Sequence, residues 1–416
     1  MIDRKHLRQF PEVFLHAFRS RGVDCDLQSL LTLDGEVLKL QKKMEGKRNQ
    51  QKLLSKGQPR LEEQEKLSHL KREIGEICTE LLEKEGHLTT ILASLPNLPL
   101  EGIPNSLSTD DNEMIRQWSK PPLFSFEPRH HLALNDKHHL FDLEKGAKLT
   151  GAGWPLYRGM GARLEWALIQ WMLDSHISSG FEMWMPPLLA DRETLYASAH
   201  LPKFRNQLYC VPEESTDYYL IPSAETVLNA IHRGDILEEA DLPKRYVAYT
   251  PCFRREAGAA GKGERGLIRT HQFNKVELFC FSSPENSLNM LDEMVAIAES
   301  LLVDLELHHR TMLLVTGDLP FAAAKAIDIE VWLPGQDRYY EVSSLSNCTD
   351  FQARRSHIRY RPAGGKPLPL HTLNGSGLAT SRLFVALMEN HQREDGSIYI
   401  PEPLRLYLGG KSELKP

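Results

Sequence analysis

Residues 245–281 read RYVAYTPCFRREAGAAGKGERGLIRTHQFNKVELFCF. Two runs of extended type flank a glycine-rich connection, so this stretch predicts two antiparallel strands joined by a long loop. The connection, Gly258–Gly266, does not match the spacing of a phosphate-binding P-loop, because Gly263 follows Lys262 where Ser or Thr is required. We therefore expect this loop to supply flexibility instead of a phosphate cradle.

The two predicted strands carry side chains that suit a nucleotide. Alternation along the first strand would place Arg254 and Glu256 on one face. A spacing of four residues would place Arg269, Phe273 and Glu277 on one face of the second strand. Guanidinium groups bind phosphates and an aromatic ring stacks on a base, so this set of side chains favours a nucleotide site. Ion pairs on a solvated sheet face are the alternative interpretation.

A second pair of strands is predicted further along the chain. Residues 326–333 alternate strictly between apolar and polar side chains, and a Pro-Gly turn leads into a second run at 338–345. The second run contains Glu341-Val342-Ser343-Ser344, which places a carboxylate beside hydroxyl groups. Such oxygen donors suit a hard cation such as Mg²⁺. The ordinary polar alternation of a surface strand would give the same pattern.

A third polar segment precedes a helical pattern near the C-terminal end. Asn374-Gly375-Ser376-Gly377 is predicted to open a helix over residues 378–390. Arg382 would then lie in its first two turns, near the positive end of the helix dipole. The glycines directly flank Ser376, so the GxSxG spacing of a hydrolase nucleophile is not met.

The region from about residue 105 onward is predicted to be an α+β domain. Helical periodicity at 163–178 and 288–309 is interspersed with strands, without the regular strand–helix–strand order of a doubly wound parallel sheet. An antiparallel sheet flanked by helices is therefore expected.

The first hundred residues have a different organisation. Apolar residues recur every seven positions in two runs, and Gly57 and Pro59 separate them. Two apolar stripes joined by a short loop must pack on each other, which predicts an antiparallel helical hairpin over about 27–95. We place an N-terminal domain at 1–104 and a catalytic domain at 105–416.

The hairpin is also the most basic part of the chain. The whole protein has a formal charge of −6, whereas residues 39–72 contain eleven Lys or Arg and four Glu, a net charge of +7. Such a concentrated positive charge suits a phosphate backbone that is held without reading its bases. A solvated charged face is the alternative.

Composition excludes several classes of protein. The chain has 416 residues, of which 41% are hydrophobic and 25% charged, and no apolar run reaches the roughly 18 residues of a membrane span. The N-terminal residues lack the apolar core of a signal peptide, and the six cysteines form no CxxC pair. We expect a cytoplasmic protein that does not associate with membranes.

Together these segments resemble the class II aminoacyl-tRNA synthetases, and among them the bacterial-type seryl-tRNA synthetases. The resemblance spans nearly the whole chain, including the hairpin. Its most specific segments correspond to the three class motifs and their surroundings: GFEMWMPPLL (180–189), LPKF (201–204), PSAE (222–225), FRRE (253–256), RGLIRTHQFNKVE (265–277), YYEVSSLSN (339–347), DFQARR (350–355) and HTLNGSGLATSRL (371–383).

The resemblance implies roles for individual residues. ATP-binding residues would be Arg254, Arg255, Glu256, Arg269, Phe273, Glu341, Val342, Ser343, Ser344 and Arg382. Serine-binding residues would be Ser223, Ala224, Glu225, Arg254, Glu277, Asn374 and Ser376. Arg254, Glu256 and Arg382 would be catalytic, with Phe273 and Arg382 on the two faces of adenine. Glu341 and Ser344 would hold Mg²⁺.

The implied activity is the ATP-dependent activation of L-serine and transfer of the seryl group to tRNA(Ser), with tRNA(Sec) as a further substrate. The family uses its hairpin to hold the long variable arm of these tRNAs, and its first motif forms a homodimer. The chain departs from the family pattern at Ser223, where Thr is usual, at Tyr340, where a basic residue is frequent, and at Thr380-Ser381. None of these departures removes a group that the chemistry requires.

Two alternatives are weaker. A synthetase for threonine or proline would need an anticodon-binding domain after the third motif, and a threonine enzyme would need zinc ligands. A catalytically silent RNA-binding relative would have lost its motif arginines, yet Arg254, Arg269 and Arg382 are all present.

Overall fold

The computed structural model describes residues 1–55, 61–256 and 266–416. Within these residues the chain divides into two compact units. One comprises Ile2–Leu98, and the other comprises Pro99–Pro416 together with Met1. The division lies a few residues before the boundary at 104 that the sequence suggested.

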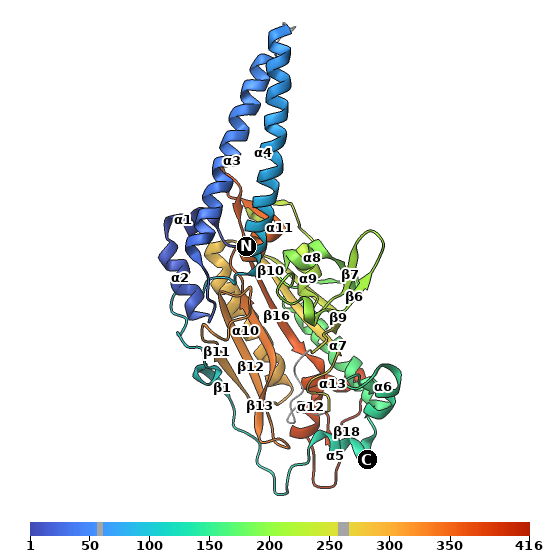
Figure 1. The fold of residues 1–416 in the computed structure, drawn as a ribbon. Coiled ribbons are helices and arrows are strands. Elements are labelled where there is room, and N and C mark those ends of the chain that lie inside the picture. Colours follow the sequence, from blue (N-terminus) through green and yellow to red (C-terminus); the bar gives the residue numbers. More distant parts are fainter. Residues whose placement is uncertain (56–60, 257–265) are drawn as a thin grey trace. The chain divides into compact units, whose positions relative to one another are not determined.

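The N-terminal unit contains two short helices followed by a long helical pair. The elements are α1 (Arg4–Gln9), α2 (Pro11–Ser20), α3 (Leu27–Leu54) and α4 (Leu61–Ser94). Helices α3 and α4 run side by side along their length (Figure 1). Leu30 and Val37 of α3 are buried, as are Leu70, Ile77 and Leu88 of α4. These residues are positions of the predicted heptads, so the helical hairpin is confirmed. Much of the predicted loop between the helices lies outside the described residues.

Polar contacts across the hairpin leave many of its cations exposed. Lys47 Nζ lies 2.8 Å from Glu73 Oε2, and Lys84 Nζ lies 2.9 Å from Glu36 Oε2. Such partly exposed pairs add little stability, and the apolar seam holds the helices together. Within the described part of the basic stretch 39–72, the exposed cations are Lys39, Lys42, Lys43, Arg48, Lys52, Lys66, Lys71 and Arg72.

The second unit is built on an eight-stranded sheet, counted over the described part of the chain. All neighbouring strands are antiparallel except β4 and β9, which are parallel. This architecture confirms the predicted α+β class. In spatial order the strands are β1 (Glu113–Trp118), β11 (His309–Leu313), β12 (Lys325–Leu333), β13 (Arg338–Asn347), β16 (His371–Ala379), β10 (Gln272–Ser282), β9 (Lys244–Phe253) and β4 (Glu182–Trp184).

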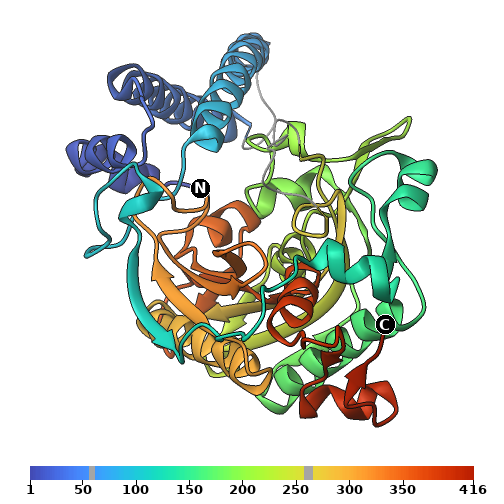
Figure 2. The same cartoon turned by 90° about the horizontal axis from the view of Figure 1, so that it is seen from below.

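The two faces of this sheet have different coverings. Helices α7 (Met160–Ser178), α10 (Ser287–Asp304) and α12 (Thr380–Asn390) pack on one face, and Figure 2 shows α7 and α10 beside each other along it. Their apolar side chains join those of the strands in the largest hydrophobic core. Helices α9 (Glu225–Ala230) and α11 (Phe351–Ser356) cover part of the opposite face. The rest of that opposite face is open to form a site.

Smaller elements surround the sheet. The short strands form four small sheets: β15 (Leu368–Pro369), β14 (Arg359–Arg361) and β8 (Ile236–Glu238); β5 (Leu189–Asp191), β7 (Asp217–Leu220) and β6 (Cys210–Pro212); β2 (Phe141–Asp142) and β3 (Leu156–Tyr157); β17 (Ile398–Tyr399) and β18 (Glu413–Leu414). The remaining α-helices are α5 (His131–His138), α6 (Leu143–Thr150), α8 (Arg192–Ala197) and α13 (Glu402–Arg405). Within the described ranges, no helix combines the length and the apolar character that crossing a membrane requires.

Two predicted helix boundaries were wrong. Helix α10 ends at Asp304 and not at His309, which already begins strand β11. The segment 374–377 does not open a helix: it lies inside β16, which pairs with β10 and β13, and α12 begins only at Thr380. Gly375 allows close packing between strands, since a Cβ added there would collide with Leu345 of β13.

A buried carboxyl group joins the helical layer to the sheet beneath the open face. Glu165 of α7 accepts hydrogen bonds from Thr380 Oγ1 and, at 2.9 Å, from Asn274 Nδ2 of β10. Its Oε2 atom has no hydrogen-bond partner among the described residues. Burial raises the pKa of Glu165 from 4.5 to about 7, so the folded protein binds a proton here that the unfolded chain releases.

Replacing Glu165 with Gln is therefore expected to change how stability depends on pH. Because the pKa of this acid is higher in the folded state, the contribution of Glu165 to the free energy of unfolding should fall by about 3 kcal/mol as the pH rises from about 4.5 to about 7. Glu165→Gln should lack this loss and unfold at a higher temperature than wild type at pH 8. Thermal unfolding at several pH values checks this, with the exposed Glu113→Gln as control. Parallel pH profiles for wild type and Glu165→Gln would contradict it.

Candidate active site

Two connected cavities lie on the open face of the large sheet. The larger has a volume of about 480 Å³ and the smaller about 300 Å³. Both are lined by Arg254, Glu256, Arg269, Lys275, Glu341 and Ser376, so the two volumes form one continuous site.

The smaller cavity brings three arginines together. Arg254, Arg269 and Arg382 all line it, with Phe273 on its wall. The guanidinium carbon of Arg254 lies 5.1 Å from the centre of the Phe273 ring, which is a cation–π arrangement. Three cations around one cavity next to an aromatic ring can accommodate a nucleoside polyphosphate. The nucleotide site inferred from the sequence thus has the required groups in one place.

Each of these guanidinium groups is also held by a neighbour. Arg269 Nε lies 2.5 Å from Glu256 Oε2. Arg382 Nη1 donates to the backbone oxygen of Glu341 at 2.7 Å and lies 3.4 Å from its carboxylate. Arg254 Nε donates to the backbone oxygen of Pro222 at 3.3 Å. These contacts orient the cations before any anion binds, which lowers the reorganisation that binding requires.

The route by which these residues meet differs from the predicted one. Strand β9 ends at Phe253 and β10 begins at Gln272, so Arg254, Glu256 and Arg269 lie outside the strands. The prediction that strand alternation places them on common faces was wrong. Glu256 instead adopts a φ of +47°, a left-handed conformation that breaks the alternation and turns its side chain toward Arg269. The glycine-rich connection, except Gly266, lies outside the described residues.

An irregularity in β13 places Glu341 and Ser344 on the same face. Residues three apart in a regular strand point to opposite faces. Here Glu330 of β12 pairs with Glu341 and Ile329 pairs with Ser343, so Val342 is an extra residue in β13. This β-bulge restores the phase, and both Glu341 and Ser344 line the larger cavity.

A second bulge acts in the same way in β16. Lys275 of β10 pairs with Ala379, whereas Glu277 pairs with Ser376. Two residues of β16 therefore lie opposite one residue of β10, and Leu378 adopts a φ of +114° at this point. Ser376 and Ala379 both face the smaller cavity as a result.

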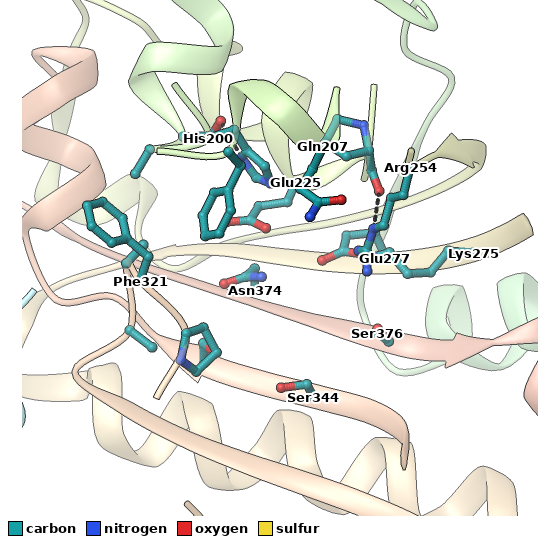
Figure 3. A pocket seen from close by; sticks show the side chains of 18 of the residues that line it. His200, Gln207, Glu225, Arg254, Lys275, Glu277, Phe321, Ser344, Asn374 and Ser376 are labelled. Carbon is teal, nitrogen blue, oxygen red and sulfur yellow. Dashed lines mark hydrogen bonds and ion pairs between the residues drawn. The ribbon is translucent and has the colours of Figure 1, made fainter. Parts of the chain in front are cut away.

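The deep end of the larger cavity is acidic. Glu277 of β10 is fully buried, and Glu225 of α9 also lines the cavity. Figure 3 shows these two carboxylates on the same side as Arg254 and Lys275, with Asn374 and Ser376 nearby. Burial raises the pKa of Glu277 and of Glu225, while the charge of Lys275 acts in the opposite direction on both. The Oε1 atom of Glu277 has no hydrogen-bond partner within the described ranges. An unpartnered buried acceptor at a cavity wall is suited to a cationic or hydroxylated ligand.

Lys275 is a site residue that the sequence interpretation missed. Its side chain is 8% exposed, and its Nζ contacts Glu277 Oε2 and donates to Ser223 Oγ at 3.0 Å. A pattern in the sequence could have identified it, since Phe273, Lys275 and Glu277 alternate along one strand. The predicted face was described with a spacing of four, which skipped the residue between.

The outer wall of the larger cavity contains further residues that the resemblance did not supply. They are His200, Phe204, Gln207 and Phe321, of which His200, Gln207 and Phe321 are labelled in Figure 3. Burial, together with the charges of Arg254 and Lys275, lowers the pKa of His200 to about 3. His200 is therefore neutral at physiological pH. It shares a 3.0 Å hydrogen bond with Ser198 Oγ.

Five predicted residues do not line either cavity: Arg255, Ser223, Ala224, Val342 and Ser343. Val342 is the bulged residue, and its side chain is buried in the main hydrophobic core. The Ser343 hydroxyl is also buried and donates to the backbone oxygen of Ser376 at 2.6 Å. The side chains of Val342 and Ser343 therefore support the strands and do not face the cavities where ATP was expected.

The other three lie beside or outside the site. The Ser223 hydroxyl donates to Glu277 Oε2 at 3.2 Å and accepts from the backbone N–H of Glu225 at 3.1 Å, so it holds the Glu277 carboxylate and the start of α9. Ala224 packs in a hydrophobic cluster with Leu228. Arg255 is exposed, because the chain turns between Arg254 and Glu256.

Another group of metal-ligand types lies away from these cavities. Among the described residues, His130, His131 and Glu389 have ligand atoms within 4.8 Å of one another. The Glu389 carboxylate already accepts from the backbone N–H groups of His131 and Gly335 and from Gln336, all at 3.0 Å. These bonds join the start of α5 to the turn after β12 and to α12. We interpret the cluster as a structural connection.

Comparison with known proteins defines the class of protein to which this fold and site correspond. Residues 209–391 match the model of the class II tRNA synthetase core domain for glycine, histidine, proline, serine and threonine. The fold and the arginine-lined site are those of a class II aminoacyl-tRNA synthetase. Residues 1–106 match the N-terminal domain of seryl-tRNA synthetases.

Relatives identify the family within that class. The serine–tRNA ligase of Chlamydia caviae is 46% identical over all of both chains, and that of Chlamydia felis is 47% identical over 100% of this chain and 99% of the relative. A crystal structure of a seryl-tRNA synthetase from Pyrococcus horikoshii with ATP has a TM-score of 0.90 and 35% identity over all of both chains. A cytoplasmic serine–tRNA ligase from Naegleria fowleri with AMP has a TM-score of 0.86 and 30% identity over 99% and 97%. The chain belongs to the seryl-tRNA synthetase family, whose members are aminoacyl-tRNA ligases, and the resemblance seen in the sequence is confirmed.

Proposed function

We propose that this chain is a serine–tRNA ligase that activates L-serine with ATP to seryl-adenylate and transfers the seryl group to tRNA(Ser). The observation that carries this proposal is one continuous site that three arginines line together with two carboxylates, Glu225 and the fully buried Glu277. The cationic end suits a triphosphate. The acidic end suits the ammonium and hydroxyl groups of a small amino acid. Two similar enzymes, whose structures were determined with ATP and with AMP, support the nucleotide assignment.

The chemistry of this reaction requires positioning more than proton transfer. The carboxylate of serine attacks the α-phosphorus of ATP and pyrophosphate leaves. Because that nucleophile is already an anion at neutral pH, no general base is needed. Arg254 would bind the α-phosphate and the substrate carboxylate, Arg269 the terminal phosphates, and Arg382 the γ-phosphate and adenine. Charge that develops on the phosphates is then neutralised by groups that are already oriented.

The acidic end would select serine through its hydrogen-bonding groups. Glu277 Oε1, the unpartnered buried acceptor, would accept from the substrate ammonium, and Asn374 and Ser376 would complete the surroundings of the hydroxymethyl group. Alanine would leave such buried groups unpaired, a penalty of roughly 1–3 kcal/mol for each unpaired group. Ser223 in place of the usual Thr retains the hydroxyl that supports Glu277.

The residues near Glu341 also fit a Mg²⁺ ion. Glu341 and Ser344 line the cavity, and Asp328 pairs with Ser344 across the neighbouring strand. Asp328 Oδ1 is shielded from solvent and has no hydrogen-bond partner in the described part of the chain, and burial and the charge of Glu341 raise the pKa of Asp328 well above its ordinary range. Hard oxygen donors and surplus negative charge are what Mg²⁺ requires. Bound there, the ion would offset negative charge on the phosphates.

The helical hairpin would hold the tRNA. Its exposed cations lie along two helices and can bind backbone phosphates without reading the bases. Such a surface suits the backbone of a long variable arm. On the same basis the enzyme would also serylate tRNA(Sec), which has a long variable arm too.

A homodimer would form through the first motif. Strand β4 is a sheet edge in the described structure, and Met183 within it and Met185 just after it are exposed. Sedimentation velocity tests the dimer directly.

The decisive test of the proposed function is ATP–pyrophosphate exchange with each of the twenty amino acids. Serine should support the fastest exchange. Alanine should be disfavoured by at least about 100-fold, because it lacks the hydroxyl group and leaves polar groups of the pocket unpaired. A higher rate with threonine or proline would assign the enzyme to one of the alternative class II activities. Absence of exchange with every amino acid would favour the silent RNA-binding alternative.

A further inference from the structure

We propose that Lys275 is a positioning residue that keeps both carboxylates of the serine pocket ionised, so that Glu277 presents one fixed acceptor to the ammonium group of the amino acid. The inference rests on the proposed function, because it concerns the way in which that same pocket binds serine. The residues concerned are Glu225, Lys275 and Glu277, which all line the larger cavity.

The geometry fixes one half of Glu277 and leaves the other half available. The Nζ of Lys275 contacts Glu277 Oε2, and the Ser223 hydroxyl donates to the same oxygen at 3.2 Å. Lys275 also donates to Ser223 Oγ at 3.0 Å, so the three groups form a closed triangle. Glu277 Oε1 makes no hydrogen bond to the described residues. The orientation of this free oxygen is therefore set by contacts to its partner oxygen.

Charge balance gives Lys275 its second role. Glu277 is fully buried and Glu225 lines the same cavity. Two such carboxylates cannot readily both remain ionised without a cation, because each loses hydration and repels the other. The Glu225 carboxylate accepts from a neutral donor, Gln352 Nε2, at 2.7 Å. With the ammonium of Lys275 present, the group of three carries one net negative charge. That charge matches the single positive charge on the ammonium group of the amino acid. The carboxylate of the amino acid is directed to Arg254.

Among the described residues, no other group around Lys275 can take the same role. Arg254 lies at the cavity wall and is assigned to the phosphate and substrate carboxylate, and His200 is neutral because its pKa is about 3. Burial raises the pKa of the Cys252 thiol on the neighbouring strand, so it carries no charge. The other charged residues on the walls of the two cavities are Glu256, Arg269, Glu341 and Arg382. Lys275 is thus the cation in direct contact with Glu277.

Lys275→Met tests the proposal, because Met has a similar length and no charge. Without the ammonium, one carboxylate of the pocket takes up a proton in the neutral range, and the pocket attracts the substrate ammonium less as the pH falls. The KM for serine in pyrophosphate exchange should therefore rise by up to about tenfold per pH unit as the pH is lowered from 8 to 6. Wild type should show a nearly flat profile over this range, and the KM for ATP should change little.

Two further variants separate charge from packing. Lys275→Arg retains a permanent cation and should restore the flat profile, whereas Lys244→Met on the adjacent strand, away from both cavities, should behave as wild type. A KM for Lys275→Met that is raised by the same factor at every pH would show that Lys275 has only a packing role. That result would overturn the proposal.

A measurement on the wild-type enzyme keeps the proposal testable if Lys275→Met does not fold. Serine binding is followed by calorimetry near pH 7.5 in buffers with different ionisation enthalpies. We expect no net proton exchange, because both carboxylates are already ionised. Release of about one proton per serine would mean that the pocket was protonated before binding, which contradicts the proposal. If wild type lacks serine-dependent exchange altogether, the proposed function has failed; if exchange occurs and a proton is released, only the role of Lys275 has failed.

Discussion

Replacing Arg254 with Ala is expected to lower serine-dependent ATP–pyrophosphate exchange by about 100-fold or more. Arg254 lines both cavities, and we propose that it contacts the α-phosphate and the carboxylate that attacks it. Its loss would leave charge on the pentavalent phosphorus without an adjacent cation. The effect should appear mainly in kcat, since the remaining arginines and Phe273 still bind the nucleotide. Single-turnover formation of adenylate gives the same information without tRNA.

A matched control shows that the loss is local. Arg116→Ala removes an arginine of β1, at the far edge of the same sheet and away from both cavities. Its Nε lies 3.1 Å from Glu299 Oε1. Its exchange rate should equal that of wild type, and the thermal unfolding of the two variants should be similar. Exchange by Arg254→Ala within about threefold of wild type would show that the arginine is not needed for charge stabilisation.

Removing residues 2–98 is expected to abolish charging of tRNA(Ser) and to preserve adenylate formation. The two units have their own internal contacts, and all the residues that line the two cavities belong to the second unit. The free energy of tRNA binding should depend strongly on the hairpin cations, so charging should fall by at least about 1,000-fold. Aminoacylation and pyrophosphate exchange, measured on the same preparation, separate the two outcomes. Normal charging by the truncated protein would exclude the hairpin as the tRNA-binding element.

A triple variant tests the same idea in the intact chain. Arg48, Lys52 and Lys71 line an open groove on the hairpin, and all three are exposed. Changing all three to Ala should weaken tRNA binding by roughly 10- to 100-fold near physiological salt and reduce the dependence of affinity on salt concentration. Exchange without tRNA should not change. An unchanged salt dependence would mean that these cations do not contact phosphates.

The parts of the fold that could be predicted are those in which one periodic pattern persists over many residues. The heptads of the hairpin gave the correct helices because the seam residues, such as Val37 and Ile77, have no other way to leave water. The alternation at Ile327, Ile329 and Val331 predicted β12 for the same reason. In both segments local preference and burial lead to the same structure.

The site was less predictable because its residues lie where the periodic pattern is interrupted. Glu256 and Leu378 have positive φ angles, and Val342 is an extra residue in its strand. No period of two or four residues reveals such interruptions. The resemblance supplied Glu341, Ser344 and the arginines, but it also included Val342 and Arg255, whose side chains do not line the cavities. Lys275 was missed although its strand parity was visible, because no motif singled it out.

The bulge at Val342 has a consequence for how this segment can change. In a regular β-strand, a shift by one residue moves every following side chain to the opposite face of the sheet. A regular strand with the same three-residue spacing would direct Ser344 toward the helical layer or would turn Glu341 into the hydrophobic core, where its charge is not tolerated. Deleting Val342 itself would bring the two groups to a spacing of two and keep them on one face. The three-residue spacing between this carboxylate and this hydroxyl therefore depends on the extra residue. A strand without the bulge would have to carry the two groups with a single residue between them.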